Sequence, residues 1–317
     1  MRIATWNVNS IRARRERVLA VLQHHEIDVL AMQETKCKAE QFPRADFEAA
    51  GYEVAVAGIN QWNGVAIASR VGLDQVRIGF PGQPGFAKEA NAVPVLEPRA
   101  IGARVGGKIG RGDGEAAGRE AAGVELWSVY VPNGRAVGDP HYHYKLDFLR
   151  ALRDYAAGLR FSGGAVAESG LLRGSGTNPQ AFGVASPQAS APPSPQNGFA
   201  AASRLLLAGD WNVIPTDADV WDPQLFASEL YATDAERAAF AAFEQVEMRE
   251  VTRPLVTNYT FWDYKQLRFP RNEGMRIDYM YASAALADRA RAAQIDRDER
   301  KGKGASDHVP VIVDFEL

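Results

Sequence analysis

Residues Ser306 to Phe315 read SDHVPVIVDF, a short stretch that combines a core strand with chemically active side chains. Apolar residues occupy every second position from 309 to 315, which is the pattern of a strand with one buried face. Asp307 and His308 stand directly before this pattern. A Ser–Asp pair at a strand end commonly forms a turn, whereas an aspartate beside a histidine also suits a catalytic pair. The stretch alone does not choose between the two, so the rest of the chain must.

The composition is that of a globular chain. Its 317 residues are 46% hydrophobic and 24% charged, so a sizeable core is available. The first seven residues lack the apolar run of a signal peptide, and no apolar run approaches the length of a membrane span. Cys37 is the only cysteine, which excludes an intramolecular disulfide and a cysteine-rich zinc site. We therefore expect a cytoplasmic protein with no membrane partner, while the net charge of −3 leaves a nucleic-acid partner open.

Short apolar strands recur along the whole chain. The clearest are Arg2–Trp6, Asp28–Gln33, Tyr52–Ala57, Gly64–Ser69, Arg99–Val105, Val124–Val131, Arg204–Gly209, Arg276–Ala282 and His308–Phe315. Helical spacing marks Ile11–Leu22 and Phe148–Leu159, and Asp234–Val246 begins with a cap at Thr233 or Asp234. Strands outnumber helices, and several strand pairs lack a helix between them. This pattern predicts an α/β fold in which two packed sheets are flanked by helices.

Two stretches interrupt the pattern. Residues 106–123 carry repeated glycines and mixed charges, and residues 161–203 consist mostly of Gly, Ala, Ser and Pro. Neither shows a sustained helical or strand period, and strands resume after each. We therefore expect two surface insertions in a single domain that spans residues 1–317.

Five strand ends carry carboxylate, amide or imidazole side chains. These residues are Asn7, Glu34, Asp210 with Asn212, Asp278, and Asp307 with His308. Each one alone is most simply explained as a turn residue, a cap or a satisfied buried carboxylate. Together they indicate a single oxygen-rich pocket, which is the kind of ligand set that Mg²⁺ prefers.

The segments TWNVNSIR, QETK, VYVPNG, GDWN, RID and SDH, in this order, closely resemble the exonuclease III family of apurinic/apyrimidinic endonucleases. That family belongs to the endonuclease/exonuclease/phosphatase superfamily, so the resemblance implies a four-layered α/β sandwich like that of DNase I. It implies a DNA-repair phosphodiesterase that hydrolyses duplex DNA 5′ to abasic sites and leaves a 3′-hydroxyl, with 3′→5′ exonuclease and 3′-end-cleaning activity. The implied cofactor is Mg²⁺, with Mn²⁺ as a substitute. The implied partner of this monomeric enzyme is double-stranded DNA with abasic sites or blocked 3′ ends.

The resemblance also implies roles for the polar residues. The implied catalytic residues are Asp210, His308, Asp278, Tyr130 and Asn212, and the implied metal ligands are Glu34, Asn7 and Asp307. Either Asp210 or His308 could be the general base. A carboxylate partner raises the pKa of a histidine, which favours His308 as a cation on the phosphate and Asp210 as the base.

Contacts to DNA are expected outside the acidic pocket. The residues expected to make them are Lys36, Arg12, Phe261, Trp262, Met275 and Arg276. Arg12 and Lys36 stand at the ends of the first two motifs and Arg276 stands near the aromatic segment, where they suit phosphate contacts that position a duplex. By resemblance, the aromatic residues and the methionine pack around an extruded baseless sugar. Their Phe–Trp order departs from the Trp–Phe order common in the family.

Two other functions are alternatives to this one. One is a superfamily phosphoesterase that acts on a small-molecule or lipid phosphodiester, and the other is a catalytically inactive DNA-binding relative. The YTFWDY segment and the four arginines between residues 12 and 17 argue against the first. The complete set of polar residues at the strand ends argues against the second.

Overall fold

A computed structural model describes residues 1–87, 89, 92–106, 123–161 and 204–317. The two expected insertions, at 106–123 and 161–203, lie outside these residues except for residues 106, 123 and 161. Among the described residues, no helix has the length and apolar character needed to cross a membrane.

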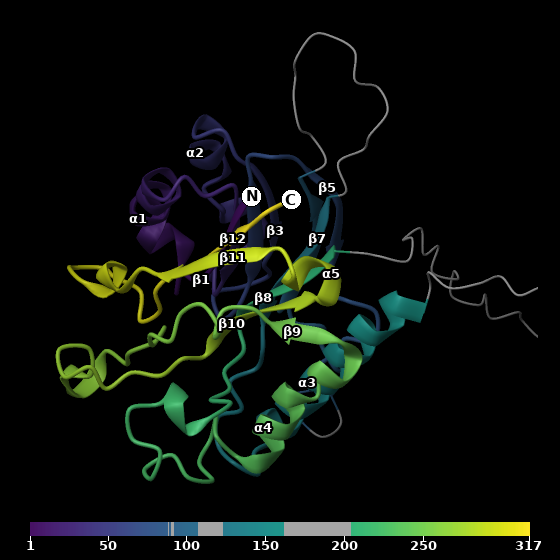
Figure 1. The fold of residues 1–317 in the computed structure, drawn as a ribbon, viewed down its shortest axis with the longest axis vertical. Coiled ribbons are helices and arrows are strands. Elements are labelled where there is room, and N and C mark those ends of the chain that lie inside the picture. Colours follow the sequence, from purple (N-terminus) through teal and green to yellow (C-terminus); the bar gives the residue numbers. More distant parts are fainter. Residues whose placement is uncertain (88, 90–91, 107–122, 162–203) are drawn as a thin grey trace, which may run out of the picture.

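Two six-stranded mixed sheets pack face to face at the centre of the described chain (Figure 1). The first has the order β11-β12-β1-β2-β4-β3, with strands β1 (Arg2–Asn7), β2 (Val29–Gln33), β3 (Glu53–Ala57), β4 (Val65–Ser69), β11 (Ala290–Ile295) and β12 (Val311–Phe315). The second has the order β5-β6-β7-β8-β10-β9, with strands β5 (Leu73–Ile78), β6 (Ala100–Val105), β7 (Val124–Tyr130), β8 (Arg204–Asp210), β9 (Met248–Glu250) and β10 (Asp278–Ser283). Each sheet contains one parallel pair, β1 with β2 and β7 with β8.

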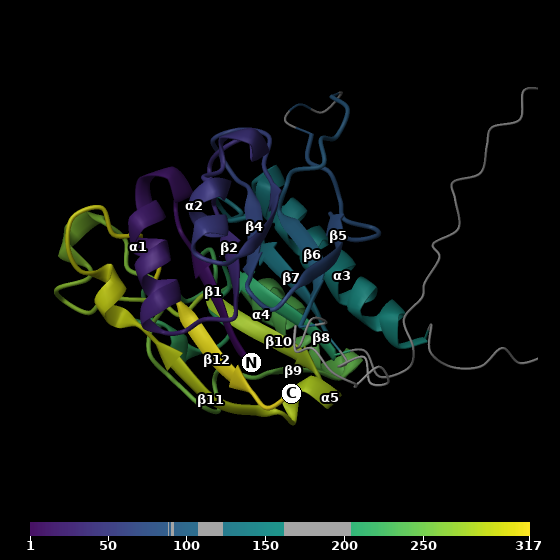
Figure 2. The same cartoon turned by 90° about the horizontal axis from the view of Figure 1, so that it is seen from above.

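Helices cover the outer faces of both sheets, which makes four layers (Figure 2). The first sheet carries α1 (Ile11–His24) and α2 (Arg44–Ala49), and the second carries α3 (Pro140–Phe161) and α4 (Asp234–Ala241). The short α5 (Ala284–Ala287) follows β10. The predicted four-layered α/β sandwich is confirmed.

Successive side chains of a strand face opposite sides of the sheet, and the apolar ones form three layers in the described chain. In β1, Ile3 faces the space between the sheets, where it joins Leu126 of β7, while Trp6 faces the other way and packs under α1 with Val18. A third layer lies between the second sheet and α3, around Phe148. Fully burying an apolar side chain of this size contributes about 1.5–3 kcal/mol, so these layers hold the strand ends in fixed positions.

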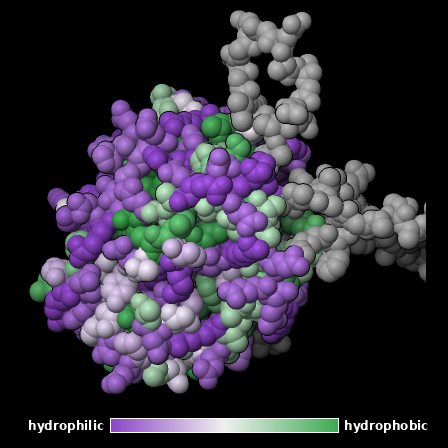
Figure 3. All heavy atoms as spheres, viewed as in Figure 1, coloured by the Kyte–Doolittle hydropathy of each residue, from purple (hydrophilic) through white to green (hydrophobic). Residues whose placement is uncertain are grey.

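The three strands that the sequence did not predict, β5, β9 and β11, each lie at one edge of a sheet. Most residues of β5 and β11 are exposed or half-buried, so these two strands carry no clear apolar signal. In Figure 3 apolar residues gather across the middle of the visible face, where β11, β12 and α5 lie in Figure 1. Half of the residues of β11 are alanine, which is uncommon in strands, so its sequence did not predict a strand.

Several predicted boundaries differ from the structure; the helix marked at Phe148–Leu159, for instance, runs from Pro140 to Phe161. The last strand begins at Val311 rather than at His308, because Pro310 has no N–H to donate to the ladder and His308 instead forms an isolated bridge with Phe261. The helix predicted for Asp234–Val246 ends at Ala241, and a separate 3₁₀ turn follows at Glu244–Val246. Its start was predicted correctly, since Thr233 caps the helix.

Candidate functional site

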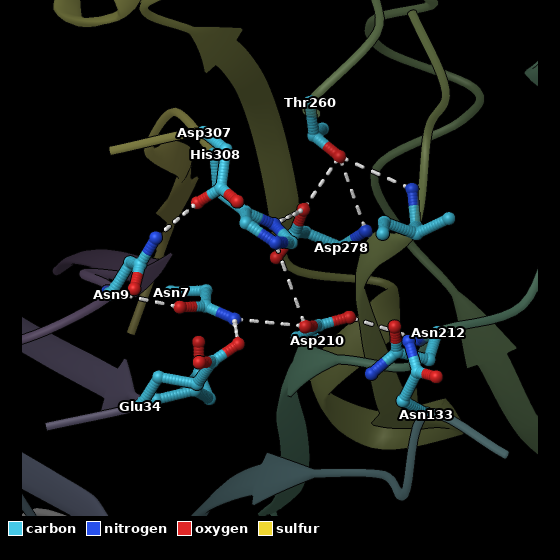
Figure 4. Close-up of polar contacts among 12 residues, drawn as sticks. Asn7, Asn9, Glu34, Asn133, Asp210, Asn212, Thr260, Asp278, Asp307 and His308 are labelled. Carbon is cyan, nitrogen blue, oxygen red and sulfur yellow. Dashed lines mark hydrogen bonds and ion pairs between the residues drawn. The ribbon is translucent and has the colours of Figure 1, made fainter. Parts of the chain in front are cut away.

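The strand directions bring the polar side chains to one end of the sandwich. Because each sheet has a parallel pair, both strands of that pair end at the same edge. Asp210, the last residue of β8, is in register with Tyr130 at the end of β7 and with Asp278 at the start of antiparallel β10. Asn7 ends β1 in the other sheet, and its amide nitrogen lies 2.9 Å from Asp210 Oδ2. The two sheet edges therefore meet at one polar cluster (Figure 4).

His308 is held by a buried carboxylate on one side and faces a second carboxylate on the other. Its Nδ1 lies 2.8 Å from Asp278 Oδ2, and this same oxygen accepts a 2.6 Å hydrogen bond from Thr260 Oγ1 (Figure 4). Its Nε2 lies 3.7 Å from Asp210 Oδ2. The imidazole is 3% exposed, so neither contact is shared with bulk water.

The charges of this group follow from burial and from these neighbours. Burial lowers the pKa of His308, but Asp278 and Asp210 outweigh it and raise the pKa to about 10. Burial raises the pKa of Asp210 to about 7, although the nearby His308 opposes the shift. The imidazole is therefore a cation at neutral pH. Asp210 titrates near neutral pH, where a general base works best.

Asn7 joins the two acidic residues of the cluster. Its Nδ2 donates to Glu34 Oε1 at 2.8 Å and to Asp210 Oδ2 at 2.9 Å (Figure 4). Its Oδ1 accepts a hydrogen bond from the backbone N–H of Asn9 at 3.1 Å. Asn7 thus presents an N–H₂ group to the two carboxylates, and its expected role as a metal ligand stays a prediction. It positions Glu34 and Asp210.

Glu34 is the best candidate to hold a divalent cation. Glu34, Asp210 and His308 offer atoms within 4.8 Å of one another. A protonated imidazole has no free lone pair, and Asp210 is 1% exposed, whereas the Glu34 side chain is 16% exposed. Burial raises the pKa of Glu34, but Lys36 and Asn7 outweigh it, so the net pKa is lowered and the carboxylate is ionised. Such a group fits a hard cation that keeps several waters.

Asp307 lies outside this group of three. Its Oδ1 accepts a hydrogen bond from Asn9 Nδ2 at 2.9 Å, and Asn9 Oδ1 accepts one from Lys36 Nζ at 2.6 Å (Figure 4). Lys36 also forms an ion pair with Glu34 at 2.6 Å. Asn9 thus connects Asp307 to Lys36. Asn9 lies in the TWNVNSIR motif, but no role was predicted for it from the sequence.

The loops that carry these side chains have unusual backbone conformations. Glu34, Lys36 and Asn212 all have φ of 50°, in the left-handed region that ordinary residues avoid. Asn212 N–H donates to Asp210 Oδ1 at 2.9 Å, and its Nδ2 donates to Val131 O at 3.0 Å. Strained backbone of this kind costs on the order of 1–3 kcal/mol per residue and clusters at functional sites.

Tyr130 stands at the end of β7 beside Asp210 as a protonated phenol. Burial, followed by the charge of Glu34, raises its pKa well above the usual value. The Arg99 guanidinium lies 4.8 Å from the ring centroid and opposes the shift without cancelling it. The hydroxyl is therefore a hydrogen-bond donor at neutral pH, as a phosphate contact requires.

The residues expected to contact DNA fall into two groups. Arg12 is exposed, Lys36 and Phe261 are half-buried, and the Phe261 ring lies 4.9 Å from that of His308. Met275, which is 9% exposed, pairs with Phe261 through two backbone hydrogen bonds of 2.9 Å. These four residues remain predicted contacts near the site. The second group consists of Trp262 and Arg276.

Trp262 and Arg276 do not fit direct substrate contact, because each is 1% exposed. Successive residues of an extended chain face opposite sides, so Trp262 points away from His308 into a core with Val309. The Arg276 guanidinium donates to Val256 O and to Thr252 Oγ1. Both residues support the loop that carries Phe261.

Comparison with known proteins fits this geometry. The model of the endonuclease/exonuclease/phosphatase family matches residues 4–308, which is nearly the whole chain. The chain belongs to this family.

Individual relatives of this family member match over almost its full length. An exodeoxyribonuclease from Bacillus subtilis is 25% identical, and the match covers 98% of both chains. A Neisseria 3′ phosphatase solved with a product DNA hairpin is 26% identical with a TM-score of 0.75, and an AP endonuclease from Archaeoglobus fulgidus is 27% identical with the same TM-score. Both structural matches cover all of both chains. The predicted resemblance to the exonuclease III family is confirmed.

This family member also contains a buried ion pair behind the site that sequence reasoning missed. Lys145 of α3 and Glu236 of α4 both have fully buried side chains and pair directly. Lys145 Nζ also donates to Asn212 O at 2.6 Å, so it supports the strained loop after Asp210. Lys145 lies in the segment DPHYHYKLDFL, where helical spacing alone gave no reason to single out a lysine.

Replacing Lys145 with methionine is expected to destabilise the fold by about 3–5 kcal/mol, because Glu236 would keep an uncompensated buried charge. Chemical denaturation with urea measures the change. Lys303→Met is the matched control, since Lys303 is exposed and should change stability little. The double variant Lys145→Met/Glu236→Gln should recover part of the loss, and equal stability of the single and double variants would contradict the buried-charge explanation.

Proposed function

We propose that this chain is a DNA-repair phosphodiesterase that hydrolyses duplex DNA 5′ to abasic sites and leaves a 3′-hydroxyl. We propose that it also has 3′→5′ exonuclease and 3′-end-cleaning activity. The main support is the contact chain from Asp278 through His308, Asp210 and Asn7 to Glu34, which joins both sheets at one cluster. The substrates of its relatives point the same way, since their names include exodeoxyribonuclease, 3′ phosphatase and AP endonuclease.

In this proposal the side chains share three tasks. Asp210 accepts a proton from the attacking water, since its pKa of about 7 lies near the working pH. His308 places a cation beside the phosphate, and the Tyr130 hydroxyl donates to it, so developing negative charge meets two preorganised donors. Asn7 and Asp278 keep Asp210 and His308 in position.

Glu34 would hold Mg²⁺, or Mn²⁺ in its place, next to the scissile phosphate. The bound ion would polarise a phosphoryl oxygen and stabilise the leaving alkoxide. Asp307 remains a proposed additional ligand, although its Oδ1 accepts a hydrogen bond from Asn9. The observation in favour of the ion is an ionised, partly exposed carboxylate at a strand end, grouped with Asp210 and His308.

We further propose that the enzyme works as a monomer in the cytoplasm on double-stranded DNA with abasic sites or blocked 3′ ends. Phe261 and Met275 would form the wall that meets a baseless sugar, because they lie on the His308 side of the cluster. Extrusion of a sugar is easiest where the base is already missing, which supplies selectivity. Arg12 and Lys36 would contact the DNA backbone.

A duplex with a single tetrahydrofuran site tests the proposal. We expect incision 5′ to that site with Mg²⁺ and none with EDTA. Glu34→Gln should abolish Mg²⁺-dependent incision while the affinity for the duplex stays near that of the wild type, because the change removes a charge on the ion rather than a DNA contact. Glu40→Gln, an exposed carboxylate six residues further on, is the control. Wild-type turnover by Glu34→Gln would exclude the ligand role, and a wild type that never cuts the duplex would refute the function.

A further inference from the structure

A concave region lies beside the cluster that contains Asn7, Glu34, Asp210, Asp278 and His308. It has a volume of about 750 Å³ and is bordered by the loop between β3 and β4, the loop between β5 and β6, and the segment after β7. Its wall includes Asn133, whose backbone carbonyl oxygen accepts a hydrogen bond from Lys145 Nζ, the same group that donates to Asn212 O of the cluster. It also includes Arg99, whose guanidinium lies over the Tyr130 ring. The cavity is therefore adjacent to the proposed phosphate site and is of a size typical of ligand sites.

The wall of this cavity contains a buried donor and a buried acceptor without partners. Arg99 Nη1 and Asn63 Oδ1 have no hydrogen-bond partner among the described residues. Asn63 is 2% exposed, and the Arg99 side chain is 8% exposed. Both atoms have almost no accessible surface, so they make the wall polar without offering direct ligand contacts. The partly open polar residues of the wall, Asn60 and Asn133, suit the edge of a nucleobase, which offers both donors and acceptors.

The mouth of the cavity is apolar and aromatic. Trp62 is 70% exposed, and Ile59 and Val93 beside the same cavity are 50% and 85% exposed. Exposed apolar side chains that gather around one cavity mark a binding surface. An indole ring at the mouth is a stacking platform for a base, and exposed Arg135 adds positive charge for a backbone phosphate.

We propose that this cavity receives an unpaired nucleobase at the 3′ end of the cleaved strand, with Trp62 stacked on the base. The inference rests on the proposed function, because the strand must be held at the catalytic cluster. A lipid chain would leave the polar lining residues Asn60, Asn133 and Arg135 without partners in the ligand. A small anion is disfavoured, because Glu97 already pairs with Arg99 at 2.5 Å and balances its charge.

Binding in EDTA, without cleavage, tests the inference. The probe is a duplex with one unpaired 2-aminopurine nucleotide at a 3′ end, compared with a fully paired duplex of the same length. Stacking on Trp62 should quench the 2-aminopurine fluorescence. Trp62→Ala should restore that fluorescence and weaken binding of the unpaired-end duplex by about tenfold, with little change for the paired duplex.

Two further variants sharpen this test. Trp62→Phe keeps a ring and should recover most of the affinity and quenching. Ile78→Ala changes an exposed apolar residue of β5 outside the cavity and should change neither. Equal affinity loss on both duplexes, or no loss on either, would overturn the inference. If the wild type still incises the tetrahydrofuran duplex, then only the inference fails; if it neither binds nor cuts DNA, both it and the proposed function fail.

Discussion

Replacing Asp210 with asparagine is expected to lower the rate of DNA cleavage by about 10²–10⁴-fold, the usual contribution of a general base. Asp210 Oδ2 faces His308 Nε2 and also accepts the hydrogen bond from Asn7 Nδ2, and an asparagine can occupy the same space with its carbonyl oxygen at that position. What it cannot do is take a proton from water. The affinity for DNA should stay near that of the wild type, because Asp210 is 1% exposed and contributes no open binding surface.

The pH dependence separates a lost base from a damaged fold. A base acts when it is deprotonated, and the pKa of Asp210 is about 7, so the wild-type rate should rise as the pH rises through that value. Asp210→Asn should lose this rise. Asp217→Asn, at an aspartate whose side chain is 70% exposed, should keep it. If the Asp210→Asn profile still rises at the same pH, another group is the base.

The polar cluster could be predicted because the ends of strands can be recognised in the sequence. Asn7, Asp210 and Asp278 each stand where an apolar run stops or starts, and strand direction alone brings such positions to one edge of a sheet. Which pairs would touch was not predictable. The 2.9 Å bond from Asn7 to Asp210 crosses between sheets, and no local pattern encodes how two sheets are placed against each other.

Other features depend on packing that local sequence does not show. Trp262 and Phe261 are neighbours in the chain, but only burial decides that Phe261 faces His308 while Trp262 is in the core. The ion pair of Lys145 was also not predictable from local sequence, because its partner Glu236 lies 91 residues away. The edge strands β5 and β11 were missed for the opposite reason, since little of their surface is buried.

Asp278→Asn isolates the charge of the carboxylate that holds His308. The hydrogen bonds from Thr260 Oγ1 and His308 Nδ1 converge on one oxygen, Asp278 Oδ2, and Oδ1 has no hydrogen-bond partner among the described residues. An asparagine can place its carbonyl oxygen at the Oδ2 position and keep both bonds. Its amide nitrogen would then take the position of Oδ1. The main change is the loss of a negative charge beside the ring.

That loss should lower the pKa of His308, because Asp278 is the foremost cause that raises it to about 10. If His308 acts as a cation on the phosphate, the rate of the variant should fall as the pH rises through the lowered pKa, while the wild type stays active to higher pH. The rate above the lowered pKa should be about 10²–10³-fold below the wild type, which is typical for loss of a charged, preorganised donor. If His308 is instead a neutral base, the acidic limb of the variant should move to lower pH. Profiles that coincide in shape and height would show that the Asp278–His308 pair has no catalytic role, and Ser306–His308 would then be only the turn before a strand.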